Sequence, residues 1–413
     1  MGLFLQNNRI DEVYCRKRNI KMKSVKSILK ADIKGKRVLV RVDFNVPIKE
    51  KKISDNTRIL AHGETINYIL EKGAKKVILI SHLGRPKGKI KPEFSLKIVC
   101  GELKKILARD ITFFNDCVGD EVKNGISKLQ DNSVCLLENL RFHPEEEKND
   151  ESFSKELAEL ADLFVQDAFA VSHRAHASTV GVTKFLPSVA GFLLMKEVKY
   201  LSELLLNPVR PFVAVLGGAK VSTKISVMSK LLKKADILLV GGAMSYTFLK
   251  ALGQNIGSSL YEEDFIGNAK ETADVCKNLF LPEDHVISKS PEKPDGERVV
   301  KSIPDGFFGV DIGPETVSKY SSIIKRAKTI FWNGPMGIFE VDDFSKGTQK
   351  IAEAIAEATT AGAISVAGGG DSVAAVKKAG VSGKFSHIST GGGASLEFVE
   401  GKTLPGIEAL MEE

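Results

Sequence analysis

The sequence predicts an α/β protein with two doubly wound parallel-sheet (Rossmann-like) domains joined by a hinge helix. Short runs of apolar and β-branched residues alternate along the chain with stretches of helical periodicity, which is typical of βαβ units. The strand-like runs are almost entirely apolar, as expected for parallel strands that helices cover on both faces. A length of 413 residues suits about two to three domains.

The first half of the chain contains the first series of these runs. Amphipathic segments between them, such as 57–72 and 96–108, predict helices. The predicted strands of this half are 37–42, 76–80, 111–114, 133–137 and 163–166.

The second half repeats the pattern. Its predicted helices are 223–234, 261–279, 344–357 and 372–379, and its predicted strands are 212–216, 236–240, 329–332 and 363–367. Between the halves, the long amphipathic stretch 190–206 ends before Pro208 and Pro211, which mark a boundary.

This organisation predicts two domains, and the cleft between them would be the default ligand site. The predicted parts are a disordered N-terminal extension at 1–21, a first domain at 22–190, an interdomain helix at 191–207, a second domain at 208–392 and a C-terminal segment at 393–413.

Composition excludes several classes of protein. The 43% hydrophobic and 27% charged residues predict a soluble globular protein, and no apolar run is long enough to span a bilayer. Five scattered cysteines without a C-x-x-C pair argue against a zinc ribbon and suit reduced thiols in a cytoplasmic protein. We expect a monomer with no nucleic-acid or membrane partner.

The net charge of +7 is unevenly distributed, with the basic excess in residues 1–23 and in the first half. A basic balance can indicate nucleic acid, a membrane surface or an anionic substrate. Nucleic-acid binding requires basic residues interleaved with exposed aromatic residues, yet only 7% of the residues are aromatic. A small anion fits this composition better.

Basic residues follow the predicted strands of the first half, where parallel strands deliver their side chains to one edge. Any one of them could be an ordinary surface residue, but several guanidinium groups at one edge indicate an anion pocket. These residues are Arg58, Arg85, Arg141, Arg174, His82 and His173.

Glycine-rich turns follow the strands of the second half. Glycines there allow backbone N–H groups to approach phosphates, although a single such turn is weak evidence. The chain has no G-x-G-x-x-G fingerprint and no P-loop, so a nucleotide must be held in another way. The turns are 217–220, 241–243, 333–337, 368–371 and 390–394.

Two further features of the second half suit a nucleotide. Lys220 and Lys224 are four residues apart at the start of a predicted helix, so they are expected to share a face that contacts phosphate. Asp371 opens another predicted helix and could be either its N-cap or a Mg²⁺ ligand. An anion site in one domain and a nucleotide site in the other together indicate phosphoryl transfer.

At these residues the sequence closely resembles the phosphoglycerate kinase family, from Met22 to the C-terminus. The resemblance implies reversible phosphoryl transfer between 1,3-bisphosphoglycerate with MgADP and 3-phosphoglycerate with MgATP. It also implies that the C-terminal segment folds back onto the first domain. The motifs that carry it are 41–47, 55–58, 81–86, 138–142, 167–178, 217–224, 241–250, 332–340, 368–372 and 390–397.

The resemblance implies a role for individual residues. The 3-phosphoglycerate site would contain Asp43, Asn45, Arg58, His82, Arg85, Arg141 and Arg174, to which we add His173. The nucleotide site would contain Gly218, Ala219, Lys224, Gly242, Gly313, Asn333, Pro335, Gly337, Glu340, Gly370, Asp371 and Ser372, with Asp371 as the Mg²⁺ ligand. The catalytic groups would be Arg58, Lys220, Lys224 and the helix start at Gly391, Gly392 and Gly393.

The expected nucleophile is a carboxylate, which is already ionised at neutral pH, so no general base is required. We therefore interpret His82 and His173 as binding or orienting residues. Two alternatives remain, a non-catalytic basic binding protein and another α/β enzyme such as a nicotinamide dehydrogenase, which the missing fingerprint disfavours.

Overall fold

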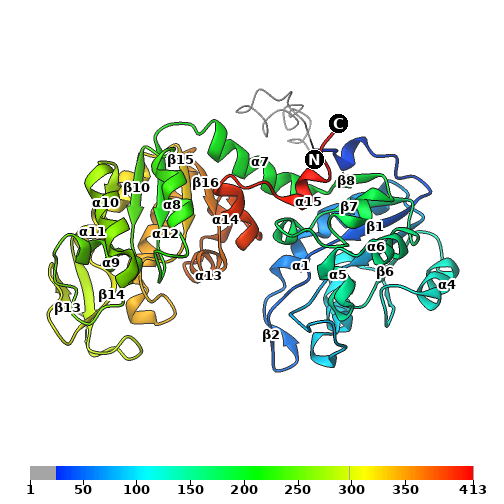
Figure 1. The fold of residues 1–413 in the computed structure, drawn as a ribbon, viewed down its shortest axis with the longest axis horizontal. Helices are drawn as coiled ribbons and strands as arrows, with labels where there is room; N and C mark the ends of the chain where they lie inside the picture. The colour runs from blue at the N-terminus through cyan, green and yellow to red at the C-terminus, as the bar shows by residue number, and fades with distance from the viewer. Residues whose placement is uncertain (1–24, 297, 413) are drawn as a thin grey trace. The chain divides into compact units, whose positions relative to one another are not determined.

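The computed structural model describes residues 25–412 with the exception of residue 297, so the predicted extension at 1–21 lies outside the described residues. The chain divides into two compact units (Figure 1). The first contains the described residues up to Lys199 and those from Thr403 onward, and the second is Tyr200–Lys402. The division falls inside the helix α7 (Phe192–Leu206), which overlaps the predicted interdomain helix.

The first unit is built on a parallel sheet with the strand order β5-β6-β4-β1-β7-β8. A short hairpin, β2 (Ile48–Lys49) with β3 (Lys52–Ile53), follows β1. The sheet strands are β1 (Arg37–Arg41), β4 (Lys76–Ile80), β5 (Ile111–Phe113), β6 (Ser133–Leu136), β7 (Leu163–Gln166) and β8 (Ser188–Ala190). The helices are α1 (Thr57–Ala61), α2 (Gly63–Glu71), α3 (Cys100–Leu107), α4 (Asp120–Lys128), α5 (Pro144–Lys148), α6 (Glu151–Ala158) and α15 (Pro405–Glu408).

Residues of both faces of this sheet are buried, as the apolar strand composition predicts. In β1, Val38 and Val40 enter one hydrophobic cluster and Leu39 enters another. Successive side chains of a strand point to opposite faces, so the two clusters lie on the two sides of the sheet.

The C-terminal residues pack on the first unit, where Figure 1 places α15 near β8. The Gly406 N–H donates to the Ser172 carbonyl (2.9 Å), and the Lys26 N–H donates to the Leu410 carbonyl (2.9 Å). These bonds tie the end of the chain to the loop after β7 and to the start of the described residues.

The second unit repeats the architecture, with a parallel sheet in the order β11-β10-β9-β15-β16-β17 and a separate antiparallel sheet in the order β13-β12-β14. Its strands are β9 (Phe212–Leu216), β10 (Ile237–Val240), β11 (Leu279–Phe280), β12 (His285–Ser288), β13 (Arg298–Val300), β14 (Phe308–Ile312), β15 (Thr329–Asn333), β16 (Ile364–Ala367) and β17 (His387–Ile388). Its helices are α8 (Ile225–Leu232), α9 (Met244–Ala251), α10 (Ile266–Val275), α11 (Pro314–Lys325), α12 (Lys346–Thr360), α13 (Gly370–Lys378) and α14 (Gly393–Val399).

Single turns of 3₁₀ helix connect several of these elements. They are η2 (Ile28–Lys30), η3 (Pro92–Phe94), η4 (Leu96–Val99), η5 (Leu140–Phe142), η6 (Phe169–Val171), η7 (Gly181–Lys184), η8 (Glu263–Phe265), η9 (Asp342–Phe344) and η10 (Ser382–Lys384).

The two parallel sheets confirm the predicted fold class, and each predicted strand overlaps an observed one. The prediction of one helix over 261–279 is wrong at its end, because Leu279 belongs to β11. No helix among residues 25–412 combines the length and apolar character that crossing a membrane requires.

Candidate active site

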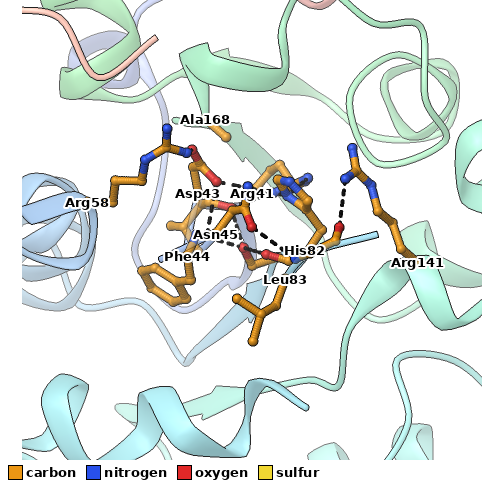
Figure 2. A network of polar contacts seen from close by, with 12 residues as sticks. Arg41, Asp43, Phe44, Asn45, Arg58, His82, Leu83, Arg141 and Ala168 are labelled. Carbon is orange, nitrogen blue, oxygen red and sulfur yellow. Dashed lines mark hydrogen bonds and ion pairs between the residues drawn. The ribbon is translucent and has the colours of Figure 1, made fainter. Parts of the chain in front are cut away.

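The predicted anion site of the first unit lies where the parallel strands end. Arg41 is the last residue of β1, His82 follows β4 by two positions, and Asp167 follows β7 directly. Parallel strands end at the same edge of a sheet, so these residues come together. Figure 2 shows Arg58 and Arg141 on opposite sides of the group around His82.

Arg41 is the buried centre of this site, a role that our sequence analysis did not assign. Its Nε donates to the Ser178 hydroxyl (2.9 Å), its Nη1 to the Val42 carbonyl, and its Nη2 to Nδ1 of His82 (3.2 Å). The buried Glu146 carboxylate accepts from the Ser178 hydroxyl (2.6 Å) and supplies a countercharge. Burial lowers the pKa of Arg41 to about 10, so the guanidinium is still a cation at neutral pH.

His82 is a neutral imidazole in this setting. Burial lowers the pKa of His82 well below its usual value, and the cations of Arg41 and Arg141 lower it further. Because Nδ1 accepts from Arg41, the proton is on Nε2, which can donate. A neutral donor among arginines suits ligand orientation.

The loop after β1 positions Arg58. The Asp43 carboxylate is only 5% exposed and pairs with the Arg58 guanidinium, which is 33% exposed (Figure 2). Asn45 donates its N–H to Asp43 Oδ1 (3.1 Å) and accepts the Gly84 N–H at its own Oδ1 (2.9 Å). The ion pair with Asp43 thus fixes the Arg58 guanidinium, whose exposed part can contact a ligand.

Arg141 completes the opposite side of the site. Its Nη1 donates to the Gly84 carbonyl (3.0 Å), and its Nε lies 3.2 Å from Glu147 Oε1. Burial lowers the pKa of Arg141, and the nearby cation of Arg174 lowers it further. These effects place Arg41, Arg58, Arg141 and Arg174 in one electrostatic neighbourhood, which we call the arginine cluster.

Two other predicted residues are less closely tied to this cluster. His173 is half-buried and accepts a hydrogen bond at Nε2 from Arg174 Nε (3.2 Å). Arg85 is exposed and forms no ion pair with any residue that the structure describes.

The glycine-rich turns of the second unit pack against one another. The Gly218 N–H donates to the Pro335 carbonyl (2.9 Å), and the Gly242 N–H donates to the Met336 carbonyl (2.8 Å). A Cβ on Gly242 would lie 2.5 Å from the Gly218 nitrogen. These two N–H groups are therefore occupied, so the expectation that glycine N–H groups reach phosphates does not hold for Gly218 and Gly242.

Free N–H groups lie instead in the first turn of α13. Gly370 and Asp371 donate their N–H groups to no acceptor among the described residues. The Ser372 hydroxyl accepts from the Gly334 N–H (2.6 Å) and so joins this helix to the turn after β15. The N-cap is Gly369, so the interpretation of Asp371 as the N-cap is wrong.

Lys224 is a half-buried ammonium beside this helix. Its Nζ donates to Asn333 Oδ1, and Asn333 Nδ2 donates to the Gly368 carbonyl (2.6 Å). Burial lowers the pKa of Lys224 to about 8, and the Asp371 carboxylate opposes that shift. Lys224, Asn333 and Asp371 therefore form one polar group at the carboxyl edge of the sheet.

Lys220 does not share a helical face with Lys224, which corrects that prediction. The helix α8 begins at Ile225, and Lys220 is exposed in the loop before it. The hydroxyl (2.5 Å) and N–H (2.9 Å) of Ser222 donate to Glu262, which holds residues 217–224 in a non-helical conformation.

The remaining predicted residues lie at turns and helix starts. Gly313 is the N-cap of α11 and donates its N–H to the Asp284 carbonyl (2.9 Å). The Gly391 N–H donates to the Ser389 hydroxyl (3.1 Å), and Gly392, with φ 53°, is the N-cap of α14 before Gly393. Ala219 and Glu340 are exposed, and Gly337 lies in the turn after β15.

Comparison with known proteins places the chain in a family. The phosphoglycerate kinase family model matches residues 28–402. The chain is 52% identical to the phosphoglycerate kinase of Moorella thermoacetica over 388 residues, covering 92% of this chain and 98% of that protein. It is also 52% identical over 398 residues to the cytosolic phosphoglycerate kinase of Triticum aestivum, covering 94% of this chain and 99% of that protein. The solved phosphoglycerate kinase of Coxiella burnetii has a TM-score of 0.83 and 40% identity, covering 94% of this chain and 98% of that one.

The chain belongs to the phosphoglycerate kinase family. Its reaction is therefore the glycolytic phosphoryl transfer of that family, and the predictions of a kinase and of a carboxyl group as acceptor are confirmed. The binding-protein and dehydrogenase alternatives no longer apply.

Proposed function

We propose that the arginine cluster binds 3-phosphoglycerate and 1,3-bisphosphoglycerate, and that the turns of the second unit bind ATP and ADP. The observation that carries this proposal is the grouping of Arg41, Arg58 and Arg141 around the neutral His82, with Arg174 near Arg141. Guanidinium groups match phosphate and carboxylate in bidentate geometry, and this ligand carries both. Side-chain surface for a ligand is available on Arg58, Arg174 and the exposed Arg85. Arg41 is fully buried and would act on the ligand only through its charge and its bond to His82.

In the second unit we assign the nucleotide phosphates to Lys224 and the first turn of α13. The unpaired N–H groups of Gly370 and Asp371 support this assignment, because a helix N-terminus attracts anions. Gly218, Gly242 and Gly313 would contact the nucleotide without their N–H groups, which already have acceptors.

Asp371 suits Mg²⁺ as a single protein ligand. Its carboxylate is exposed in the first turn of α13, and Mg²⁺ commonly combines one or two carboxylates with substrate phosphates and water. Bound there with the nucleotide, Mg²⁺ would neutralise phosphate charge.

The reaction consists of charge neutralisation and alignment. In the direction that consumes ATP, a carboxylate oxygen of 3-phosphoglycerate forms a bond to the γ-phosphorus, and the bond from that phosphorus to the β–γ bridging oxygen breaks. The carboxylate is ionised at neutral pH, so no residue has to remove a proton. Arg58, Lys220, Lys224 and the backbone N–H groups of Gly392 and Gly393 would stabilise the charge of the transferring group, whereas the Gly391 N–H already donates to Ser389.

Because these groups come from both units, we expect closure of the two units to assemble the site. We further propose a cytoplasmic monomer that binds neither nucleic acid nor membrane. The cytosolic wheat relative supports the location, and the low aromatic content supports the absence of a nucleic-acid partner.

The test replaces Arg58 with alanine and measures turnover of 3-phosphoglycerate with MgATP in a coupled assay. We expect kcat to fall about 10²–10³-fold with the fold intact, as for other groups that stabilise transition-state charge. Arg109→Ala is the control, because Arg109 is exposed and bonds only to the Asn132 carbonyl (3.2 Å) in the described structure. A normal kcat for Arg58→Ala would remove Arg58 from the mechanism.

A further inference from the structure

A buried chain of hydrogen bonds leads from the anion site to the start of α7. The Asp43 N–H donates to Nε2 of His62 (2.8 Å), and Nδ1 of His62 donates to Asp167 Oδ2 (2.6 Å). His62 is 1% exposed and Asp167 is fully buried. Neither His62 nor Asp167 was among the site residues predicted from the sequence.

The partners fix the tautomer of His62. A backbone N–H can only donate, so Nε2 must carry a lone pair, and the proton must be on Nδ1, which faces a carboxylate. The Phe44 ring packs edge-on against the imidazole at 5.8 Å, which limits its rotation. His62 therefore holds the Asp43 backbone in one orientation.

The other oxygen of Asp167 satisfies the first turn of α7. Oδ1 accepts the N–H of Leu193 (2.9 Å), while the Thr65 hydroxyl accepts the N–H of Phe192 (3.0 Å). A Cβ on Gly191 would lie 2.2 Å from Asp167 Oδ1, so this approach depends on glycine. Asp167 thus bonds both to His62 and to the helix that continues from the first unit into the second.

His62 and Arg58 act on the same residue from one helical surface. They are four positions apart, with Arg58 in α1 and His62 at its C-cap. Arg58 pairs with the Asp43 carboxylate, and His62 binds the Asp43 backbone, so Asp43 is held at two points.

We propose that His62 is a positioning residue, whose imidazole fixes the Asp43 loop for substrate binding in the tautomer that Asp167 imposes. This inference rests on the proposed assignment of 3-phosphoglycerate to the arginine cluster. Loss of the bond from the Asp43 N–H to His62 would release the loop that orients Arg58. The affinity for 3-phosphoglycerate should then fall by about five- to ten-fold, the effect of one hydrogen bond.

Three variants separate this role from a general packing role. His62→Asn keeps a donor near Asp167 but cannot reach Asp43, whereas His62→Gln can place an oxygen where Nε2 accepts. In Asp167→Asn the oxygen must face the α7 N–H groups, so the amide NH₂ faces His62 and forces its proton onto Nε2. We expect His62→Asn and Asp167→Asn to raise the Kd for 3-phosphoglycerate, measured by calorimetry, five- to ten-fold. His62→Gln should stay within about two-fold of the unmodified chain.

Two controls make the outcome decisive. The ¹⁵N NMR signals of His62 should show the Nδ1–H tautomer in the unmodified protein and the Nε2–H tautomer in Asp167→Asn. The Kd for MgADP should be unchanged, since Asp43, His62 and Asp167 all belong to the first unit. An Nε2–H tautomer in the unmodified protein, or equal losses in His62→Gln and His62→Asn, would overturn the proposal.

The same titrations separate this proposal from the site assignment on which it rests. If Arg58→Ala, Arg141→Ala and Arg174→Ala all bind 3-phosphoglycerate normally, the substrate does not use the arginine cluster and the assignment fails. If Arg58→Ala loses affinity while His62→Asn and Asp167→Asn do not, only the role of His62 fails.

Discussion

Burial lowers the pKa of His82 and of Lys224, with different consequences for their charge at neutral pH. His82 is kept neutral among arginines, so it can donate a hydrogen bond without adding to the repulsion between cations. Lys224 also has a lowered pKa, but its value of about 8 leaves it mostly charged at neutral pH. The protein therefore has one residue that stays neutral and one whose charge is sensitive to mildly alkaline pH.

Lys224 should make nucleotide binding depend on pH. Above about pH 8 the free protein loses the ammonium proton, and a bound phosphate would have to restore it. We expect the Kd for MgADP to rise about ten-fold between pH 7 and pH 9 by calorimetry. Lys224→Arg keeps its charge over this range and should bind with a constant Kd.

The control for this experiment is Lys220→Arg in the exposed loop before α8, which should retain the pH dependence of the unmodified chain. If the unmodified protein binds MgADP equally well at pH 7 and pH 9, Lys224 does not contact the phosphates in its charged form.

At the scale of elements, the glycine turns hold the second unit together, in addition to the nucleotide contacts proposed for them. Gly242 has φ 66°, and a Cβ there would also lie 2.7 Å from the Gly218 carbonyl oxygen. Backbone atoms on both sides leave no side chain that could move away. The turns after β9, β10 and β15 are therefore interdependent.

Gly242→Ala should accordingly destabilise the second unit by more than the cost of conformational strain, because the new Cβ would also overlap backbone atoms. Gly253 is the matched control, because it has φ 79° but nothing within 4 Å of a Cβ. We expect Gly253→Ala to cost about 1 kcal/mol of unfolding free energy and Gly242→Ala about 3 kcal/mol, since overpacking adds to the strain. Urea unfolding followed by fluorescence of the single tryptophan, Trp332, measures both, because Trp332 is buried in the second unit. If the two variants lose the same unfolding free energy, the close packing of the turns around Gly242 adds nothing to the cost of strain.

The central strands could be predicted from the sequence because they are buried on both faces, which leaves an apolar signature. The edge strands β11 and β17 could not be predicted, because each has only two residues, which is too short to give a recognisable apolar pattern. The antiparallel strands β12, β13 and β14 were also missed. The turn at 217–220 was predicted, but Lys220 was wrongly placed at a helix start, because the conformation up to Lys224 depends on the distant Glu262, which no local periodicity reveals.

The arginines were predictable because strand ends share an edge of the sheet. Arg41 was not recognised, because its burial depends on Ser178 and Glu146, which lie far along the chain. His62 was missed for the same reason, as its partners Asp43 and Asp167 meet it only in the folded unit. Position along a strand predicts which side chains reach a site, whereas tertiary hydrogen bonds decide which of them are free to bind.

For the whole molecule, the two units carry separate acid-sensitive histidines. In the second unit, His285 of β12 is 2% exposed, and burial lowers its pKa to about 4. Its ring packs near Tyr246 at 5.6 Å, and its Nδ1 has no hydrogen-bond partner among the described residues. In the unfolded chain this imidazole binds a proton near pH 6.5, so below that pH the unfolded state takes up a proton that the folded state does not.

The stability of the second unit should therefore decrease as the pH falls from 7 to 5, with His285 contributing about 2 kcal/mol of the loss. His285→Gln cannot titrate, so this contribution should disappear when urea unfolding is followed by Trp332 fluorescence at both pH values. The first unit should keep its own acid sensitivity in the variant, because His82 lies there and its pKa is also lowered. Calorimetry at the two pH values would detect that remaining sensitivity. If the tryptophan-reported stability of His285→Gln decreases as steeply as that of the unmodified chain, His285 is already protonated in the folded second unit.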